Sequence, residues 1–211
     1  GLTGSKVESG LVAGTYDYTV TCVNAIGTQV SDTKQTIVYA APTVDVKVDG
    51  SDGPTITRTA PYTYNASWTS TNATQCTGSA RLAGYSGISG SRSESNVAAG
   101  TTYDYIVTCQ NAAGTTASDT VRMVVVAAPT IDVKVNGSDG PLNFTEPAGY
   151  MVTWSSTDAS NCTALNNLSG ATGLSGSRVY ANVLQGVYRY GMTCSNSAGT
   201  VVTDIVQVTV N

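Results

Sequence analysis

The feature that most constrains this chain is an internal repeat. The segment Pro-Thr-Val-Asp-Val-Lys-Val at 42–48 returns as Pro-Thr-Ile-Asp-Val-Lys-Val at 129–135. Three further pairs of motifs recur in the same order: 51–54 and 138–141, 68–71 and 154–157, and 87–92 and 173–178. Copies this similar are expected to adopt the same fold, and in such arrays each copy contacts mainly its neighbours. The sequence therefore predicts tandem modules.

The same register extends to the N-terminus. The motif at 87–92 appears a third time at 1–6, which aligns three cysteines: Cys22, Cys109 and Cys194. The alignment predicts three parts: 1–40 as the C-terminal half of a domain, 41–127 as a complete domain and 128–211 as another. The first part lacks a counterpart of residues 41–86, so we expect the chain to belong to a longer array.

Apolar residues within a repeat recur with a period of two, which indicates strands rather than helices. The alternation is clear at 44–48, 62–68, 103–109 and 121–125. Shorter strands are expected around Cys76 and over 92–97, which makes roughly seven strands per repeat, joined by Gly, Asn, Asp and Pro turns. We see no amphipathic segment of helix length. The pattern is typical of an antiparallel β-sandwich.

Composition excludes several classes of function. The formal net charge is −4, from 10 basic and 14 acidic side chains, which argues against nucleic-acid binding. No stretch approaches the roughly 20 apolar residues of a membrane span, so we expect no direct membrane insertion. The chain has no histidine, which removes Ser-His-Asp and Cys-His catalysis and most zinc and haem sites. We therefore expect no enzyme and no cofactor.

The five cysteines fit one disulfide per complete repeat. Cys76 is expected to pair with Cys109 and Cys162 with Cys194, while Cys22 is left over because its partner would precede residue 1. Closing loops of this size stabilises a domain by about 3–4 kcal/mol in the chain-entropy treatment. A metal site is the alternative, but each repeat offers two isolated cysteines and no histidine. Disulfides predict an oxidising location, extracellular or on the cell surface.

Two longer motifs resemble a known family. Each repeat carries Trp-(Thr/Ser)-Ser-Thr ending eight residues later in Cys76 or Cys162, then Tyr-x-Tyr-x-x-Thr ending in Cys109 or Cys194. With the Ser-Asp-Gly-Pro turn, these motifs resemble the bacterial immunoglobulin-like repeats of large secreted and surface proteins. The resemblance implies an all-β chain of tandem immunoglobulin-like antiparallel β-sandwiches in a stalk, adhesin or surface fibre.

The match departs from the antibody pattern, in which the first cysteine precedes the tryptophan. Here the tryptophan comes first, so the disulfide is expected to link the strand after 62–68 to the strand 103–109. Four aromatic residues are then predicted to lie in the core: Trp68, Trp154, Tyr105 and Tyr190. Four tyrosines could instead form a sugar-stacking platform: Tyr62, Tyr64, Tyr103 and Tyr105. Their alternation favours core packing, and buried hydroxyls then need partners.

Several aspartates are candidates for chemistry. Weak calcium candidates are Asp49, Asp52 and Asp139, although an Asp-Gly turn explains the same residues and is favoured. Asp119 and Asp204 lack a partner at catalytic spacing, and a structural ion pair or hydrogen bond beside Arg92 or Arg178 is the favoured role. Weak glycosylation sequons begin at Asn65, Asn72, Asn136, Asn143, Asn161 and Asn167.

Two functions from different classes fit this sequence. In the first, the repeats form a stiff extracellular rod or filament, because the linkers 40–42 and 127–129 are short and end in proline. Its partners are neighbouring domains of the same array, with other copies in a filament. In the second, the chain is an adhesin module that binds a glycan or protein through loops. The most divergent loops are 77–86 and 163–172, with Leu82, Tyr85, Leu165 and Leu168 as contact candidates.

Overall fold

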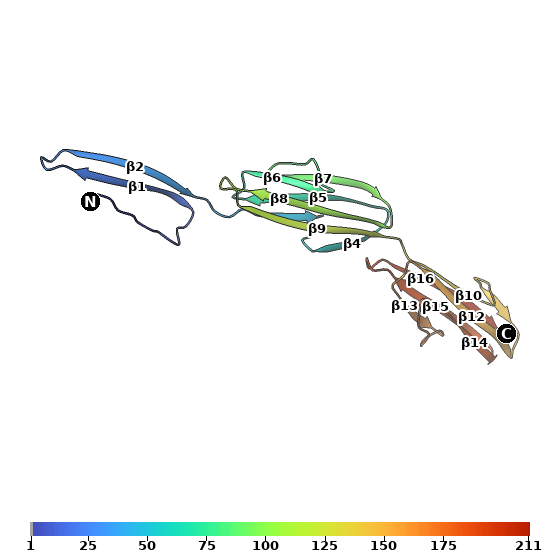
Figure 1. The fold of residues 1–211 in the computed structure, drawn as a ribbon. Coiled ribbons are helices and arrows are strands. Elements are labelled where there is room, and N and C mark those ends of the chain that lie inside the picture. Colours follow the sequence, from blue (N-terminus) through green and yellow to red (C-terminus); the bar gives the residue numbers. More distant parts are fainter. Residues whose placement is uncertain (1) are drawn as a thin grey trace. The chain divides into compact units, whose positions relative to one another are not determined.

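The computed structural model describes residues 2–211, which form sixteen β-strands and no α-helix. Gly1, the first residue of the predicted half-domain, lies outside the described residues. Nothing within 2–211 is a helix that could cross a lipid bilayer. The strands fall into a hairpin and two sandwiches (Figure 1).

The N-terminal part is a two-stranded antiparallel hairpin. Its strands are β1 (Gly14–Val23) and β2 (Gln29–Val38), and the register places Cys22 opposite Val30 and Tyr18 opposite Lys34. The two strands pair only with each other. The preceding residues 2–13 contribute no strand.

The middle sandwich consists of two sheets. One sheet has the order β3-β5-β7 and the other β4-β9-β8-β6. The strands are β3 (Thr43–Val48), β4 (Thr55–Thr59), β5 (Tyr62–Thr71), β6 (Gln75–Ala80), β7 (Ser89–Val97), β8 (Thr101–Gln110) and β9 (Thr116–Val126). Along β5 the side chains of Tyr64, Ala66 and Trp68 are buried and those between them are more exposed, which is the period of two seen in the sequence.

The C-terminal sandwich repeats this topology, with sheets β10-β12-β14 and β11-β16-β15-β13. Its strands are β10 (Thr130–Val135), β11 (Leu142–Phe144), β12 (Ala148–Thr157), β13 (Asn161–Asn166), β14 (Ser175–Val183), β15 (Gly186–Ser195) and β16 (Val201–Val210). The short β11 pairs with β16 in parallel, so the sandwich is not wholly antiparallel as expected.

Each sandwich therefore has seven strands in sheets of three and four, an immunoglobulin-like layout, and the all-β fold expected from the sequence is confirmed. The predicted aromatic residues lie in the two cores: Tyr105 is 0% exposed, Tyr190 1%, Trp68 3% and Trp154 6%. Both tryptophans donate their indole N–H to a glycine carbonyl oxygen, Gly87 at 3.0 Å and Gly173 at 3.3 Å.

In both sandwiches the indole of the core tryptophan packs against the backbone of the last glycine in the Gly-x-Ser-Gly motif. A Cβ added at Gly90 would lie 2.3 Å from a ring carbon of Trp68, and one added at Gly176 would lie 2.4 Å from Trp154. Only glycine leaves that space. The glycine in the repeated Gly-x-Ser-Gly motif is therefore a packing requirement in both sandwiches.

Candidate functional site

The disulfides lie within a sheet rather than between sheets. Cys76 in β6 bonds to Cys109 in β8, and Cys162 in β13 bonds to Cys194 in β15. In each case the two cysteines sit directly opposite each other on neighbouring antiparallel strands. These are the pairs expected from the sequence. Cys22 is a free cysteine and is exposed.

Three aspartates of the middle sandwich come together. Asp45, Asp52 and Asp119 each have a carboxylate oxygen within 4.8 Å of the others. Asp119 accepts a 2.6 Å hydrogen bond from the backbone N–H of Val46, and the Lys47 ammonium group lies 2.5 Å from Asp45. The hydrogen bond from Lys47 to Asp45, more than any other contact, raises the pKa of Lys47. The second oxygen of Asp45 is buried and has no hydrogen-bond partner among residues 2–211.

Asp49, one of the predicted calcium ligands, does not join this cluster. Its carboxylate accepts a hydrogen bond from the backbone N–H of Asn65 at 2.9 Å, and its backbone has a φ of 48°. Both features are those of a turn residue that caps the neighbouring strand. Asp52 is the only predicted calcium candidate of the middle sandwich that lies in the cluster, and the sequence did not point to Asp45.

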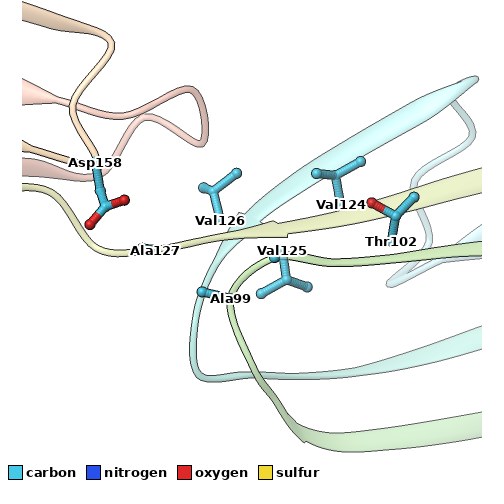
Figure 2. Close-up of a pocket in the computed structure, with 8 residues that line it drawn as sticks. Ala99, Thr102, Val124, Val125, Val126, Ala127 and Asp158 are labelled. Atoms are coloured by element: carbon cyan, nitrogen blue, oxygen red, sulfur yellow. The ribbon is translucent and has the colours of Figure 1, made fainter.

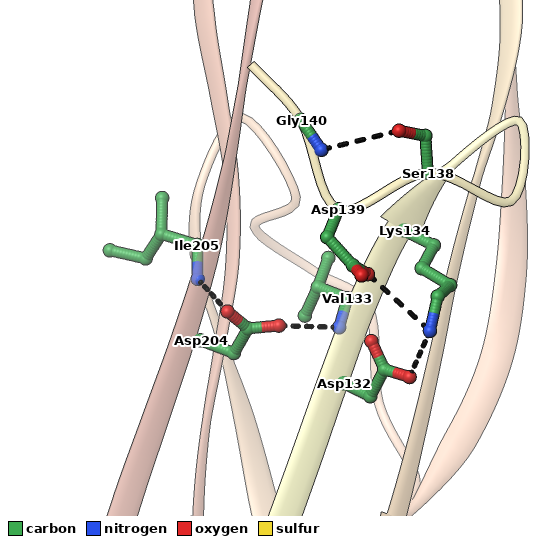
Figure 3. Close-up of polar contacts among 8 residues, drawn as sticks. All are labelled: Asp132, Val133, Lys134, Ser138, Asp139, Gly140, Asp204 and Ile205. Carbon is green, nitrogen blue, oxygen red and sulfur yellow. Dashed lines mark hydrogen bonds and ion pairs between the residues drawn. The ribbon is translucent and has the colours of Figure 1, made fainter. Parts of the chain in front are cut away.

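The C-terminal sandwich has the equivalent hydrogen bond and lysine ion pair (Figure 3), but its described aspartates do not gather into such a three-carboxylate cluster. Asp204 accepts a 2.7 Å hydrogen bond from the backbone N–H of Val133. Lys134 makes ion pairs with Asp132 and, at 3.4 Å, with Asp139. The lysine cation therefore neutralises the carboxylates that a calcium ion would need in this sandwich.

The two equivalent aspartates thus have a structural role, but with a different partner from the one we expected. Asp119 and Asp204 accept hydrogen bonds from the backbone of the opposite sheet, not from an arginine. Arg92 donates instead to the carbonyl oxygen of Arg81 at 2.9 Å, and Arg178 donates to that of Ser169 at 3.0 Å. A backbone N–H carries no side-chain signal, so the sequence could not reveal this partner.

A cluster of tyrosines occupies the C-terminal core. The hydroxyl groups of Tyr150 and Tyr190 lie 2.6 Å apart, and the ring of Tyr180 is 4.8 Å from that of Tyr190 between centroids. Burial, the largest cause, raises the pKa of both Tyr150 and Tyr190. In the middle sandwich the strand position of Tyr180 is taken by Glu94, which is only 7% exposed. No motif in the sequence pointed to this buried carboxyl group.

The divergent loops do not present their leucines to solvent. Leu82 and Leu168 are both 0% exposed and belong to the cores of their sandwiches. Leu165 is half-buried, and Tyr85 is 38% exposed with its ring edge-on to Trp68. The contact surface that we expected from Leu82 and Leu168 is therefore wrong.

All six predicted sequon asparagines are exposed. Four of them use their side chains in hydrogen bonds to the protein: Asn65, Asn72, Asn136 and Asn167. Asn143 and Asn161 make no such bond to the described residues. A glycan would be attached to the side-chain Nδ2, and among these six asparagines only Asn72 uses that atom in a hydrogen bond to the described residues.

The loops between the last two strands of each sandwich carry a repeated asparagine. Asn111 is 3% exposed and Asn196 is 5% exposed. Each side-chain oxygen accepts two backbone N–H groups of its own loop, at 2.9–3.0 Å for Asn111 and 3.0 Å for Asn196. Each Nδ2 donates at 2.8 Å to a carbonyl oxygen of the linker that enters the same sandwich, Ala40 and Ala127 respectively. The asparagine therefore ties the linker to the loop.

Figure 2 shows a hollow beside the end of β9. Val124 and Val126 of β9 and Thr102 of β8 line it. None of these three side chains is an acid, a base or a nucleophile of the activated kind that catalysis requires.

No family model and no curated protein matches this chain. Similar solved structures include the fibronectin(III)-like modules of Clostridium thermocellum CbhA, at 15% identity and a TM-score of 0.40 over 79% of this chain and 94% of that one. The titin A168169 segment has 13% identity and a TM-score of 0.37, over 82% and 100%. A Ca2+-stabilized, ice-binding adhesin of an Antarctic bacterium has 22% identity and a TM-score of 0.33, over 93% and 57%. These likenesses carry no argument about function.

Proposed function

We propose that this chain is a length of an extracellular or cell-surface shaft, built from tandem disulfide-bonded immunoglobulin-like domains of the bacterial surface-repeat type. The proposed domains are 41–127 and 128–211, with 1–40 as the second half of another. Their partners are neighbouring domains of the same array, with other copies of the chain in a filament. The module is structural, and it has no enzymatic role.

The observation that supports this proposal most directly is the anchored linker. A short Ala-Ala-Pro segment leads into each sandwich, and its proline is buried at both Pro42 and Pro129. The buried Asn111 and Asn196 side chains hold the linker carbonyl groups. A tether between independent modules needs no such fixation, whereas a shaft gains stiffness from it.

The proposal is tested by the distance between dyes on the two sandwiches, measured by single-molecule energy transfer. We expect one narrow distribution for the wild type. Asn196→Asp keeps the oxygen that the loop N–H groups need but removes the amide donor to Ala127, so its distribution should be broader. The control is Asn24→Asp, the same change in the hairpin loop, where Nδ2 has no acceptor among the described residues. A distribution that is equally broad in wild type and Asn196→Asp contradicts a stiff shaft.

The location is tested separately. Gold-labelled antibodies against residues 41–211 should decorate extracellular fibres or stalks on intact cells of the source organism. Label found only after the cells are permeabilised contradicts the proposal.

The second proposal, an adhesin module, has one supporting observation. Tyr85 is partly exposed, and the centroid of its ring lies 5.6 Å from the guanidinium carbon of Arg92. An aromatic ring and a cation are therefore adjacent here. Specific binding of the intact chain on a glycan array, lost in Tyr85→Ala, would favour this role over the shaft.

A further inference from the structure

The hairpin β1–β2 presents an uncovered face. In the sandwiches the equivalent strands are β8–β9 and β15–β16, and the three-stranded sheet covers their inner face. Val107 of β8 is 1% exposed, whereas Val20, its equivalent in β1, is 66% exposed. The register of the repeat places Tyr16, Tyr18 and Cys22 on the same face as Val20.

Three polar groups of the hairpin match groups that are engaged in the sandwiches. Cys22 is free, whereas its equivalents Cys109 and Cys194 are bonded to a cysteine of the first half of their own repeat. Two further side chains of the hairpin extend this match. In the sandwiches, their equivalents form hydrogen bonds with the first half of the repeat or with the linker that precedes it.

Asp32 stands at the position of Asp119 and Asp204, which accept a hydrogen bond from the first strand of the opposite sheet. Asp32 has no such partner among residues 2–211. Asn24 accepts its two loop N–H groups at 3.1 and 2.9 Å, as Asn111 and Asn196 do. Its Nδ2 has no acceptor in the described chain, whereas theirs bind the residue that leads into the first strand.

Gly4 aligns with Gly90 and Gly176 of the Gly-x-Ser-Gly motif, although the N-terminal copy has threonine in place of the serine. A Cβ at either of those glycines would collide with a tryptophan, but a Cβ at Gly4 would meet nothing within 4 Å. The motif therefore preserves space for an indole that residues 2–211 do not supply at this position. The surrounding residues 4–11 form no strand, although their equivalents form β7, which belongs to the three-stranded sheet.

From these matches we infer that β1–β2 is the second half of an immunoglobulin-like sandwich, covered by a first half-repeat that precedes residue 1 on the same polypeptide. The covering segment has the layout of residues 41–86, with a tryptophan that packs over Gly4. The cysteine of this segment forms a disulfide with Cys22, and a backbone N–H of its first strand donates a hydrogen bond to Asp32. A backbone carbonyl oxygen just before that strand accepts a hydrogen bond from Nδ2 of Asn24. Residues 4–11 become the third strand of its sheet. We place the segment on the same polypeptide because the two halves of each sandwich are consecutive in the chain. The loop between β6 and β7 connects them in the middle sandwich, and the loop between β13 and β14 does so in the C-terminal one.

Two positions distinguish β2 of the hairpin from its equivalents in the sandwiches. Lys34 and Thr36 of β2 stand where β9 carries Val121 and Met123, which are 1% and 0% exposed. A covering segment must leave the Lys34 ammonium group access to water or place a carboxylate beside it, because an unpaired buried charge is costly. The natural segment is therefore expected to differ from residues 41–86 opposite Lys34.

The inference is tested by extending the full chain with a second copy of residues 41–86 placed directly before residue 1. Peptide mapping without reduction should link Cys22 to the cysteine of the added copy. Amide hydrogen exchange in β1–β2 should slow by at least about tenfold, since local opening would require loss of the new core. Replacing Lys34 by Val and Thr36 by Met in the extended chain matches the second half to the added copy and should strengthen both effects. The control has Cys→Ser in the added copy, which should restore the alkylation of Cys22.

Alkylation of Cys22 in the extended Lys34→Val, Thr36→Met chain at the rate of the unextended chain would overturn the inference. A second measurement does not depend on refolding of this extended chain. In the parent polypeptide from its source, Cys22 should be linked to a cysteine that follows a tryptophan within the same chain. A free Cys22, a Cys22–Cys22 link between copies, or a parent species near 21.6 kDa under reducing, denaturing conditions would each overturn it. The anchored linkers and the cell-surface label test the shaft separately.

Discussion

The backbone of Gly176 in β14 lies directly against the indole of Trp154 in β12. A Cβ at this glycine would come within 2.4 Å of a ring carbon, and the neighbouring ring atoms would be at 2.9 Å. The strands pair so that these two residues are opposite each other. Because the indole is 6% exposed and donates its N–H to Gly173, the ring has little freedom to move away.

We therefore expect Gly176→Ala to destabilise the C-terminal sandwich by about 1–3 kcal/mol, the usual cost of overpacking a core. Denaturant unfolding of the full chain measures the effect. The matched control is Gly4→Ala, the same motif position without an indole, which should leave unfolding unchanged. Gly149→Ala, whose added Cβ would lie 3.7 Å from a carbonyl oxygen, is a second control. Equal stability of Gly176→Ala and wild type would show that the ring can shift.

Removal of the Asp204 carboxylate leaves the backbone N–H of the buried Val133 without its hydrogen-bond acceptor. Asp204→Ala should lower the free energy of unfolding of the C-terminal sandwich by about 1–3 kcal/mol. Asp204→Asn, which can retain a neutral acceptor oxygen, should lose less. Asp32→Ala is the matched control, because that aspartate has no partner among the described residues. If Asp204→Ala and Asp32→Ala behave alike in calorimetry, the inter-sheet hydrogen bond contributes nothing.

The tyrosine pair makes the C-terminal sandwich sensitive to alkali. Burial raises the pKa of Tyr150 and Tyr190 in the folded state above the value of about 10 in the unfolded chain. Above that pH the unfolded chain loses protons that the folded state retains, so stability falls as pH rises. The contribution of the pair is fully present below pH 10.

Tyr190→Phe tests this dependence. At pH 7 it should cost about 1 kcal/mol through the lost hydrogen bond. Between roughly pH 9.5 and 11 its melting temperature should fall less steeply than that of the wild type, because one group with a raised pKa is gone. Parallel melting curves across this range would mean that Tyr190 ionises as freely in the folded state as in the unfolded one.

The Leu168 side chain packs into the C-terminal core from a loop whose sequence differs between the two copies. Leu168→Ala should cost about 2–5 kcal/mol, as expected for a fully buried leucine. Leu184→Ala, at a residue that is 64% exposed, should change stability by no more than about 0.5 kcal/mol. Hydrogen exchange measured by mass spectrometry assigns the loss to the C-terminal sandwich. If the Leu168→Ala chain is as stable as the wild type, Leu168 is not packed in the core, and the loop lies on the surface as the sequence predicted.

The period of two and the internal register were sufficient to predict the sandwiches, the placement of Trp68 and Tyr105 and the pairing of the four cysteines. They did not predict β4, which has five residues and one buried side chain, Ile56. A strand this short leaves too little alternation to detect. Leu82 and Leu168 were assigned to loop surface because a buried residue within a turn has no periodic signal.

The candidate sites were harder to predict than the fold. Asp45 in β3 and Asp52 in the turn that follows it join Asp119 only because β9, which is distant in sequence, passes beside them in the fold. The hydrogen bond of Asp119 goes to a backbone N–H, a group that every residue but proline offers. Glu94 is buried in a strand of mostly polar residues, and its burial depends on packing that the residue type alone does not indicate.

The position of the disulfides has a mechanical consequence. Each bond joins neighbouring strands of one sheet and closes a loop with a sequence separation of 33 or 32 residues. When an unfolded sandwich is pulled from its ends, tension passes through the bond and bypasses that loop. At about 3.4 Å per extended residue, the loop withholds roughly 110 Å of contour length. A stretched sandwich can therefore yield only part of its chain to force, and the remainder is released only by a reductant.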